Sequence, residues 1–413
     1  MSEKISSDQK RILVVSQHFW PENFRVNDIA EFLKEADCSI DILCGLPNYP
    51  KGELYKGYKK RFFQREIHEN VTIYRIFEVL RGNNSNVRIF LNYISFPFFA
   101  SLCIPFFLFK RYDRILLYET SPVFMAFPGI LLGKLKRIKT VMYVLDLWPE
   151  NLYSVISVKN KYLRFLLKKV SHWHYRKVDK LIVLSKAMEV KIKSFTKKRD
   201  DDVVIIPQVC EELYAGRKYD KHLQERFALG FNLVFTGNIS PAQSFETVLD
   251  AACMLKKKGI ADINWIIVGD GMSSDWLCEQ VFLRKLTDQF YFEGYKPITE
   301  VPKYTTIAHA LFGCLVKSEL LEATIPAKVL SYIASRKPVI LAMDGEIRDT
   351  INDNNCGFAG PAGDAASLAE NIEKVYRLSI EERQIMEKNC SQLHSEQFDR
   401  NKNMWKLYNF LFS

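Results

Sequence analysis

The sequence predicts an α/β protein with two doubly wound domains, each built on a mostly parallel sheet with helices on both faces. Short runs rich in Ile, Val and Leu alternate with segments whose apolar residues recur at helical spacing. This alternation is broken once, by a polar stretch within 207–231, and then resumes. The 413 residues also suffice for roughly two to three domains.

In the first half, each expected strand is a short apolar run. Residues 12–16 form the first, and a helix follows because Val26, Ile29, Ala30 and Leu33 share one helical face. The other expected strands are 40–44, 71–77, 114–118, 140–145, 180–184 and 203–206.

In the second half, the same pattern predicts strands at 232–236, 263–269, 290–293, 310–316 and 337–342. Two such sheets in tandem predict a cleft between the domains, lined by the carboxyl ends of strands from both halves.

Segment 89–109 is nearly all apolar and long enough to cross a bilayer. Pro97 and Pro105 interrupt it, and Asn92 and Ser95 lie inside it. We therefore expect a buried or membrane-grazing helix.

The charge balance favours anionic partners. The 58 basic and 48 acidic residues leave a net charge of +10, which suits a phosphate-rich ligand, nucleic acid or an anionic membrane surface. No known nucleic-acid-binding module is present, so nucleic acid is not the expected partner. Nine scattered cysteines and a polar N-terminus without a signal-peptide pattern predict a cytoplasmic protein.

Three glycine loops follow successive expected strands of the second half. Glycine lets backbone approach a ligand closely, and free amides at a helix start bind phosphate oxygens. Each loop alone has a plain alternative as a turn, but together they favour a nucleotide site. The candidate nucleotide-binding residues in these loops are Gly237, Asn238, Gly269, Asp270, Gly271, Gly294, Tyr295 and Lys296.

A further candidate is the helix start at Ile325, Pro326 and Lys328. Proline at the first helical position leaves neighbouring amides free. A lysine in the first turn is unfavourable beside the positive end of the helix dipole unless an anion lies nearby. The alternative is a solvated lysine.

Two loops of the first half combine an aromatic residue, a proline and a carboxylate at a strand end. Tryptophan faces and carboxylates suit a carbohydrate, whereas the alternative is that Trp20 and Trp148 only cap the sheet core. The candidate carbohydrate-binding residues are His18, Trp20, Pro21, Glu22 and Asn23 in one loop and Asp146, Trp148 and Glu150 in the other.

Several signals are absent from the sequence. There is no dinucleotide-binding glycine fingerprint and no phosphate loop with G-K-[ST]. No convincing metal-ligand spacing exists, so we expect neither a metal nor a resident cofactor.

Seven ordered motifs together resemble the family 4 glycosyltransferases, which are retaining enzymes of GT-B architecture. The similarity extends to a branch found in bacterial capsule, O-antigen and exopolysaccharide clusters, which includes N-acetylfucosaminyl- and related amino-sugar transferases. The motifs are F-W-P-E-N-F-R-V-N-D-I-A (19–30), G-L-P-N-Y-P-K-G (45–52), L-N-Y-I-S-F (91–96), D-L-W-P-E (146–150), G-N-I (237–239), V-G-D-G (268–271) and T-I-P-A-K (324–328).

The resemblance implies two Rossmann-like domains facing a cleft. Residues 1–208 would bind the acceptor, residues 209–390 the nucleotide sugar, and residues 391–413 would form a helix returning to the N-terminal domain.

The resemblance also implies roles for single residues. Gly237, Asn238 and Lys328 would face the donor diphosphate, Gly294 and Tyr295 the base, and Ser331 the ribose. Asp146 would be the acceptor-side catalytic group. The sequence departs from the wider family at residues 323 and 331, where Ala323 and Ser331 replace a glutamate pair. It departs again at residues 240–243, which lack the usual Arg/Lys pair.

The expected activity is metal-independent sugar transfer with retention. The co-substrate would be a nucleoside-diphosphate sugar, UDP-linked, and the acceptor a polyprenyl-diphosphate-linked glycan at the inner face of the cytoplasmic membrane. A non-catalytic relative that binds sugar nucleotide or membrane, and a nucleic-acid-binding protein, are the alternatives.

Overall fold

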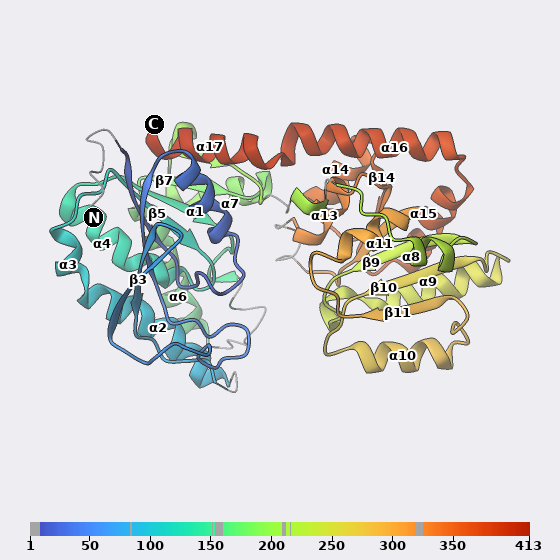
Figure 1. Ribbon diagram of the computed structural model, residues 1–413, viewed down its shortest axis with the longest axis horizontal. Helices are drawn as coiled ribbons and strands as arrows, with labels where there is room; N and C mark the ends of the chain where they lie inside the picture. Colours follow the sequence, from blue (N-terminus) through green and yellow to red (C-terminus); the bar gives the residue numbers. More distant parts are fainter. Residues whose placement is uncertain are drawn as a thin grey trace. The chain divides into compact units, whose positions relative to one another are not determined.

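The computed structural model describes residues 9–82, 85–150, 152, 160–208, 212–214, 216–318, 322 and 325–413. The chain divides into two compact units (Figure 1). The N-terminal unit comprises Met1–Ile206 with Met404–Ser413, and the C-terminal unit comprises Pro207–Asn403.

The N-terminal unit is built on an eight-stranded sheet of order β3-β4-β2-β1-β5-β6-β7-β8. All neighbours are parallel except β3 and β4. Its strands are β1 (Arg11–Val15), β2 (Ser39–Cys44), β3 (Phe63–His68), β4 (Val71–Ile76), β5 (Arg114–Glu119), β6 (Thr140–Val144), β7 (Lys180–Val183) and β8 (Val203–Ile205).

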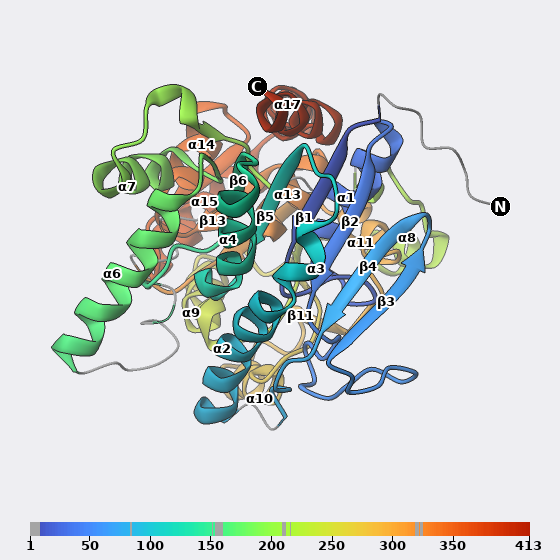
Figure 2. The same ribbon diagram turned by 90° about the vertical axis from the view of Figure 1, so that its left-hand side faces the viewer.

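Helices cover this sheet, and α2, α3 and α4 pack against one another on one side of it (Figure 2). The helices are α1 (Val26–Glu35), α2 (Asn86–Leu102), α3 (Ile104–Leu108), η1 (Val123–Ala126), α4 (Phe127–Lys136), α6 (Lys161–Lys177), α7 (Lys186–Thr196) and η2 (Asp200–Asp202).

The C-terminal segment of the chain also contributes to the N-terminal unit through α17 (Arg400–Phe412). The Trp405 ring lies edge-on to Phe32 with centroids 5.2 Å apart. Arg114 Nε donates to the Leu411 carbonyl at 2.8 Å. Residues 391–403 belong to the C-terminal unit instead.

The C-terminal unit holds an all-parallel six-stranded sheet of order β11-β10-β9-β12-β13-β14. Its strands are β9 (Phe231–Thr236), β10 (Ile263–Val268), β11 (Phe290–Gly294), β12 (Ala310–Cys314), β13 (Val339–Ala342) and β14 (Gly357–Gly360). Its helices are η3 (Glu212–Tyr214), α8 (Lys221–Arg226), η4 (Pro241–Gln243), α9 (Phe245–Lys257), α10 (Ser274–Leu283), α11 (Val301–Ile307), α13 (Ala327–Ala334), α14 (Glu346–Asp353), α15 (Ala365–Arg377), α16 (Ile380–Leu393) and η5 (His394–Phe398).

Two apolar cores flank this second sheet. Leu233 and Phe235 of β9 enter one core, while Val234 between them enters the other. Successive side chains of a strand point to opposite faces, so both faces of β9 are buried. This explains the uninterrupted apolar runs in the sequence. The predicted α/β class with two doubly wound parallel sheets is confirmed.

Two strands escaped the sequence prediction. Strand β3 alternates between partly and largely exposed residues and lies at the sheet edge, where an apolar run is not needed. Strand β14 has four residues and begins and ends with glycine, which weakens any strand signal.

Segment 89–109 forms most of α2 and α3. Phe96, Ala100 and Phe107 face the core, whereas Phe98 and Phe109 are 57% and 91% exposed. Among the described helices, none is long and apolar enough to cross a membrane. The segment is thus one-sided, with a buried face and an uncovered apolar face.

Candidate functional site

The three glycine loops of the C-terminal unit lie side by side at the carboxyl edge of its sheet. They follow β9, β10 and β11, which are neighbours. Gly237 N donates to the Val268 carbonyl and Gly269 N to the Gly294 carbonyl, both at 2.9 Å. Ile239 N donates to the Asp270 carbonyl, also at 2.9 Å. The backbone itself therefore joins the loops into one surface.

Two of these glycines are required by close backbone packing. A Cβ on Gly269, which has φ of +146°, would lie 1.9 Å from the Gly237 carbonyl oxygen. A Cβ on Gly271 would lie 2.2 Å from the Ile239 oxygen and 2.4 Å from the Asn238 side-chain oxygen. Larger residues would force the loops apart.

Lys328 reaches this surface from the first turn of α13. Its Nζ lies 4.2 Å from the centroid of the Phe235 ring and donates to Gln243 Oε1. Among the described residues, no carboxylate pairs with it. Burial lowers the pKa of the Lys328 ammonium to about 8. An anion bound here would be attracted by the Lys328 ammonium, whose charge no described carboxylate neutralises.

The start of α13 is held in place by a tyrosine that the sequence did not single out. Tyr332 OH accepts from Thr236 N at 2.9 Å and lies 3.2 Å from its carbonyl, so α13 is tied to the end of β9. Pro326 precedes the helix, and no side chain caps it. The Ala327 and Lys328 amides are thus among the unsatisfied amides of a helix start.

The remaining predicted donor residues differ in exposure. Tyr295 is 76% exposed, and Ile325 packs partly against the core. Lys296 Nζ lies 5.8 Å from the Tyr304 ring centroid. Ser331 is buried and its hydroxyl bonds to the Ala327 carbonyl at 3.3 Å, so contact with a ribose requires that it rotate.

Asp270 belongs to the scaffold of its own loop. Its carboxylate accepts from the Ser274 hydroxyl and the Gly271 amide, both at 2.7 Å. These bonds lower its pKa, the Ser274 bond most. The carboxylate therefore shapes the loop after β10.

In the N-terminal unit, the loop after β1 is organised by a buried carboxylate. Glu22 is 1% exposed and lies 2.9 Å from His18 Nδ1. Its other oxygen accepts from Asn48 N and Tyr49 N at 2.8 and 2.6 Å. His18 and Glu22, predicted to contact an acceptor, are thus buried and fix two loops to each other.

The neighbouring residues of this loop are more accessible. Trp20 stacks on His68 with ring centroids 3.7 Å apart and is partly exposed. Pro21 is partly exposed and Asn23 is exposed. These three side chains are the ones of this group that solvent reaches.

A buried polar network lies at the same sheet edge and was not predicted from the sequence. Glu78 accepts from Gln17 Nε2 and Asn48 Nδ2 at 2.8 and 2.7 Å, and Gln17 also donates to Asn92 at 3.0 Å. Burial raises the pKa of Glu78 well above its usual value. The sequence signal was a polar residue following each apolar strand run.

This network holds an arginine that was also missed. Arg81 Nε donates to Asn92 Oδ1 at 3.3 Å, and its guanidinium lies 5.2 and 5.4 Å from the Tyr49 and Tyr93 ring centroids. The side chain is partly exposed. Among the described residues, it makes no direct ion pair with a carboxylate.

Asp146 lies at the end of β6 and is partly exposed. Beside it, Glu119 ends β5 and is fully buried. Burial, and then the charge of Asp146, raise the pKa of Glu119 well above its usual value. The protonated form of Glu119 is therefore favoured. Glu119 was missed because it ends an otherwise apolar run.

The other two predicted residues of this loop make contacts within the N-terminal unit. Trp148 is 1% exposed, its indole N–H donates to Ser121 at 2.7 Å, and its ring lies near Phe124 and Tyr93. A sugar-stacking role for Trp148 is therefore wrong for this structure, because its faces are covered by core aromatics. Glu150 pairs with Lys191 at 3.2 Å.

No group of three or more His, Cys, Asp or Glu side chains placed to hold a metal is found among the described residues. Ala323 and Thr324, which were named in the resemblance to family 4, lie outside the described residues.

Comparison with known proteins now adds to this geometry. Residues 225–392 match the family described as "Glycosyl transferases group 1". This match confirms the expected enzyme class, a glycosyltransferase.

Sequence and structure relatives agree with this class. The chain of this glycosyltransferase is 24% identical to the "Probable glycosyltransferase WbjE" of Pseudomonas aeruginosa over 276 residues. The aligned residues make up 65% of this chain and 68% of that protein. Anabaena Alr3699/HepE in complex with UDP has a similar structure, with a TM-score of 0.68, 14% identity and coverage of 98% and 99% of the two chains. WaaG, a glycosyltransferase involved in lipopolysaccharide biosynthesis, gives a TM-score of 0.66, 12% identity and coverage of 97% and 99%. The fold is thus that of the GT-B glycosyltransferases.

Proposed function

We propose that this glycosyltransferase is a retaining, metal-independent enzyme of family 4. It would move a hexose or N-acetylhexosamine from a UDP-sugar to a lipid-linked glycan in bacterial surface polysaccharide biosynthesis. The amino-sugar branch is part of this proposal. The observation that carries it is Lys328, a cation without a carboxylate partner among the described residues, placed against three glycine loops at one sheet edge.

The donor would bind to the C-terminal unit. Its diphosphate would meet Lys328 and the free amides at the start of α13, beside the Gly237 backbone. When the bond from the anomeric carbon to the diphosphate oxygen breaks, negative charge grows on the leaving diphosphate. Fixed amides and an ammonium stabilise that charge without rearranging. The UDP-bound HepE structure supports a uridine nucleotide.

The acceptor would bind to the N-terminal unit. The acceptor hydroxyl forms the new bond to the anomeric carbon and loses its proton, and Asp146 would orient this hydroxyl or accept its proton. Arg81 would contact the acceptor diphosphate, because its guanidinium makes no direct ion pair with a carboxylate among the described residues.

Attachment to the inner face of the cytoplasmic membrane is supported by the surface of the N-terminal unit. Large apolar side chains are exposed on its helices α2, α3 and α6 and at the residue after α3: Phe90, Ile94, Phe98, Leu102, Phe106, Phe109, Leu163, Phe165 and Leu166. Basic residues accompany them on α6 at Lys161, Arg164, Lys168 and Lys169. A lipid-linked acceptor would be presented at such a surface.

The donor is tested by a thermal-shift screen of nucleotide sugars, in which a bound donor stabilises the folded protein. UDP release is then measured with and without a lipid-linked acceptor. Release that increases with the acceptor supports transfer. Donor binding without any acceptor-dependent release would instead favour the non-catalytic alternative.

Asp146→Asn tests the acceptor side. We expect UDP binding close to that of the wild type and at least a hundredfold slower transfer, because the substitution removes the charge and preserves the shape. Isothermal titration with UDP and an acceptor-dependent rate assay measure the two effects. Wild-type turnover in Asp146→Asn would remove this residue from the mechanism.

A further inference from the structure

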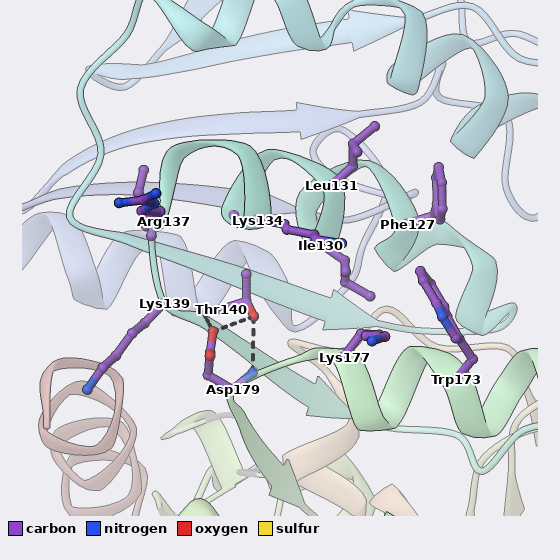
Figure 3. Close-up of a pocket in the computed structure, with 12 residues that line it drawn as sticks. Phe127, Ile130, Leu131, Lys134, Arg137, Lys139, Thr140, Trp173, Lys177 and Asp179 are labelled. Carbon is purple, nitrogen blue, oxygen red and sulfur yellow. Dashed lines mark hydrogen bonds between the residues drawn. The ribbon is translucent and has the colours of Figure 1, made fainter.

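A cavity of about 460 Å³ lies in the N-terminal unit, between α4, α6 and the beginning of β6 (Figure 3). None of the predicted donor or acceptor residues lines it. Its size is within the range of roughly 300–1,000 Å³ that small-molecule sites occupy. It is therefore large enough to hold a ligand.

The two ends of this cavity differ in chemistry. Phe127 and Trp173, with ring centroids 5.9 Å apart, lie at one end with Leu131. Arg137 and Lys139 lie toward the opposite end (Figure 3). Lys134 and Lys177 complete a set of four cations, which we call the basic rim: Lys134, Arg137, Lys139 and Lys177.

The basic rim is not neutralised within the part of the chain that the structure describes. None of its four side chains has a hydrogen bond or ion pair to a described residue. Asp179, the carboxylate nearby, accepts from the amide and hydroxyl of Thr140 at 2.7 and 2.9 Å. Lys136, in contrast, donates to the carbonyls of Leu108 and Lys110, so it serves the fold.

The four cations exceed the one lining carboxylate, Asp179, and lie beside an apolar wall. Together they complement a ligand with an anionic head and a hydrocarbon chain. We propose that this cavity binds an anionic phospholipid of the membrane, with the headgroup phosphate at the basic rim and one chain against Phe127, Leu131 and Trp173. Phosphate contacts with lysine and arginine give charge-assisted bonds, and the chain leaves water at the apolar end.

The surroundings of the cavity favour a bilayer as the source of this ligand. Leu135, on α4 next to the rim, is 57% exposed, and α4 packs against α3, which leads to Phe109. The choice of a bilayer lipid rests on the proposed membrane attachment. The cavity's preference for an anionic amphiphile does not.

Binding is tested with octyl, decyl and dodecyl phosphate, each below its micelle concentration, titrated into the full-length protein. We expect affinity to rise roughly fourfold per added methylene. Dodecyl maltoside, which has the same chain and no charge, is expected to bind at least tenfold more weakly than dodecyl phosphate. Equal binding of the two detergents, or complete competition by inorganic phosphate, would overturn the proposal.

Variants separate the two ends of the cavity. Replacing the four rim residues with glutamine is expected to weaken all three alkyl phosphates by at least tenfold. Trp173→Ala is expected to flatten the dependence on chain length. The matched control replaces four exposed cations of the C-terminal unit, Lys257, Lys285, Lys317 and Lys388, with glutamine and is expected to bind dodecyl phosphate like the wild type. Equal losses in the rim and control variants would indicate diffuse charge attraction and overturn the site.

The source is tested with vesicles of phosphatidylcholine containing phosphatidylglycerol. We expect dodecyl phosphate to reduce vesicle binding of the wild type and not that of the rim variant. Dodecyl phosphate that binds the wild type but leaves its vesicle binding unchanged would overturn the assignment to a bilayer lipid. These readouts need no sugar transfer, so failure of the proposed transferase activity would be seen separately.

Discussion

The carboxyl edges of the two sheets are formed by different kinds of residue. In the C-terminal unit, glycine loops bond to one another through their backbones, and Lys328 adds a single cation. In the N-terminal unit, the corresponding edge is packed with buried polar and aromatic side chains, among them Glu22, Glu78 and Trp148.

This difference separates two ways of placing a ligand. Small residues let Lys328 and the uncapped start of α13 remain accessible at one edge, which suits a diphosphate. Buried side chains instead fix the shape of their loops and leave a few groups, such as Asp146 and Arg81, to face solvent. Substitutions should therefore mainly change ligand binding at one edge and stability at the other.

The largest effect is expected for Trp148→Ala. It removes a buried indole and should lower the free energy of unfolding by about 3–5 kcal/mol. Tyr295→Ala, at the other edge, removes a 76% exposed ring and should cost less than about 0.5 kcal/mol. Urea denaturation of both variants measures the contrast. Similar losses in the two variants would break the distinction between the edges.

Lys328→Ala should reduce donor use a hundredfold or more and leave stability nearly unchanged. A charge-assisted contact that strengthens as the diphosphate leaves accounts for about 3 kcal/mol. Steady-state rates with the UDP-sugar found by the screen measure this loss, and EDTA is expected to leave the wild-type rate unchanged. Lys296→Ala is the control and should retain most activity. The reverse ranking of the two lysines would move the role to Lys296.

Gly269→Ala tests the close backbone packing of the glycine loops. The added Cβ would meet the Gly237 carbonyl, so we expect a loss of about 2 kcal/mol in stability and at least tenfold weaker UDP binding. Gly259→Ala is the matched control, because Gly259 also has a positive φ but open space around it. It should cost only about 1 kcal/mol and keep UDP affinity. Equal UDP affinities in both variants would show that the loop does not contact the nucleotide.

The smallest effect concerns pH. The pKa of Lys328 is lowered to about 8, and the protonated form attracts a diphosphate. UDP affinity should therefore be constant below pH 8 and fall by up to about tenfold per unit above it. Lys328→Ala should remove this dependence. Titrations with UDP between pH 7 and 9.5 measure it, and a flat wild-type profile would contradict the role of this ammonium.

The sequence by itself determined the fold class, most strands and the glycine loops. Both faces of a parallel sheet are buried, so each of its strands is an apolar run in the sequence. This signal does not depend on which strands pair with each other. The loops at 237–239 and 269–271 were likewise visible, because glycine is required where backbones pass closely. These features depend on residues near one another in the chain.

Only the tertiary structure decided which polar and aromatic side chains are buried. Trp20 and Trp148 occur in similar local sequences, yet one is partly exposed and the other is enclosed by Phe124, Tyr93 and Ser121. The network around Glu78 and the unneutralised rim of the α4–α6 cavity also join residues distant in the chain. Burial and charge compensation are set by neighbours in space, and the neighbours follow from strand order, which local sequence patterns do not encode.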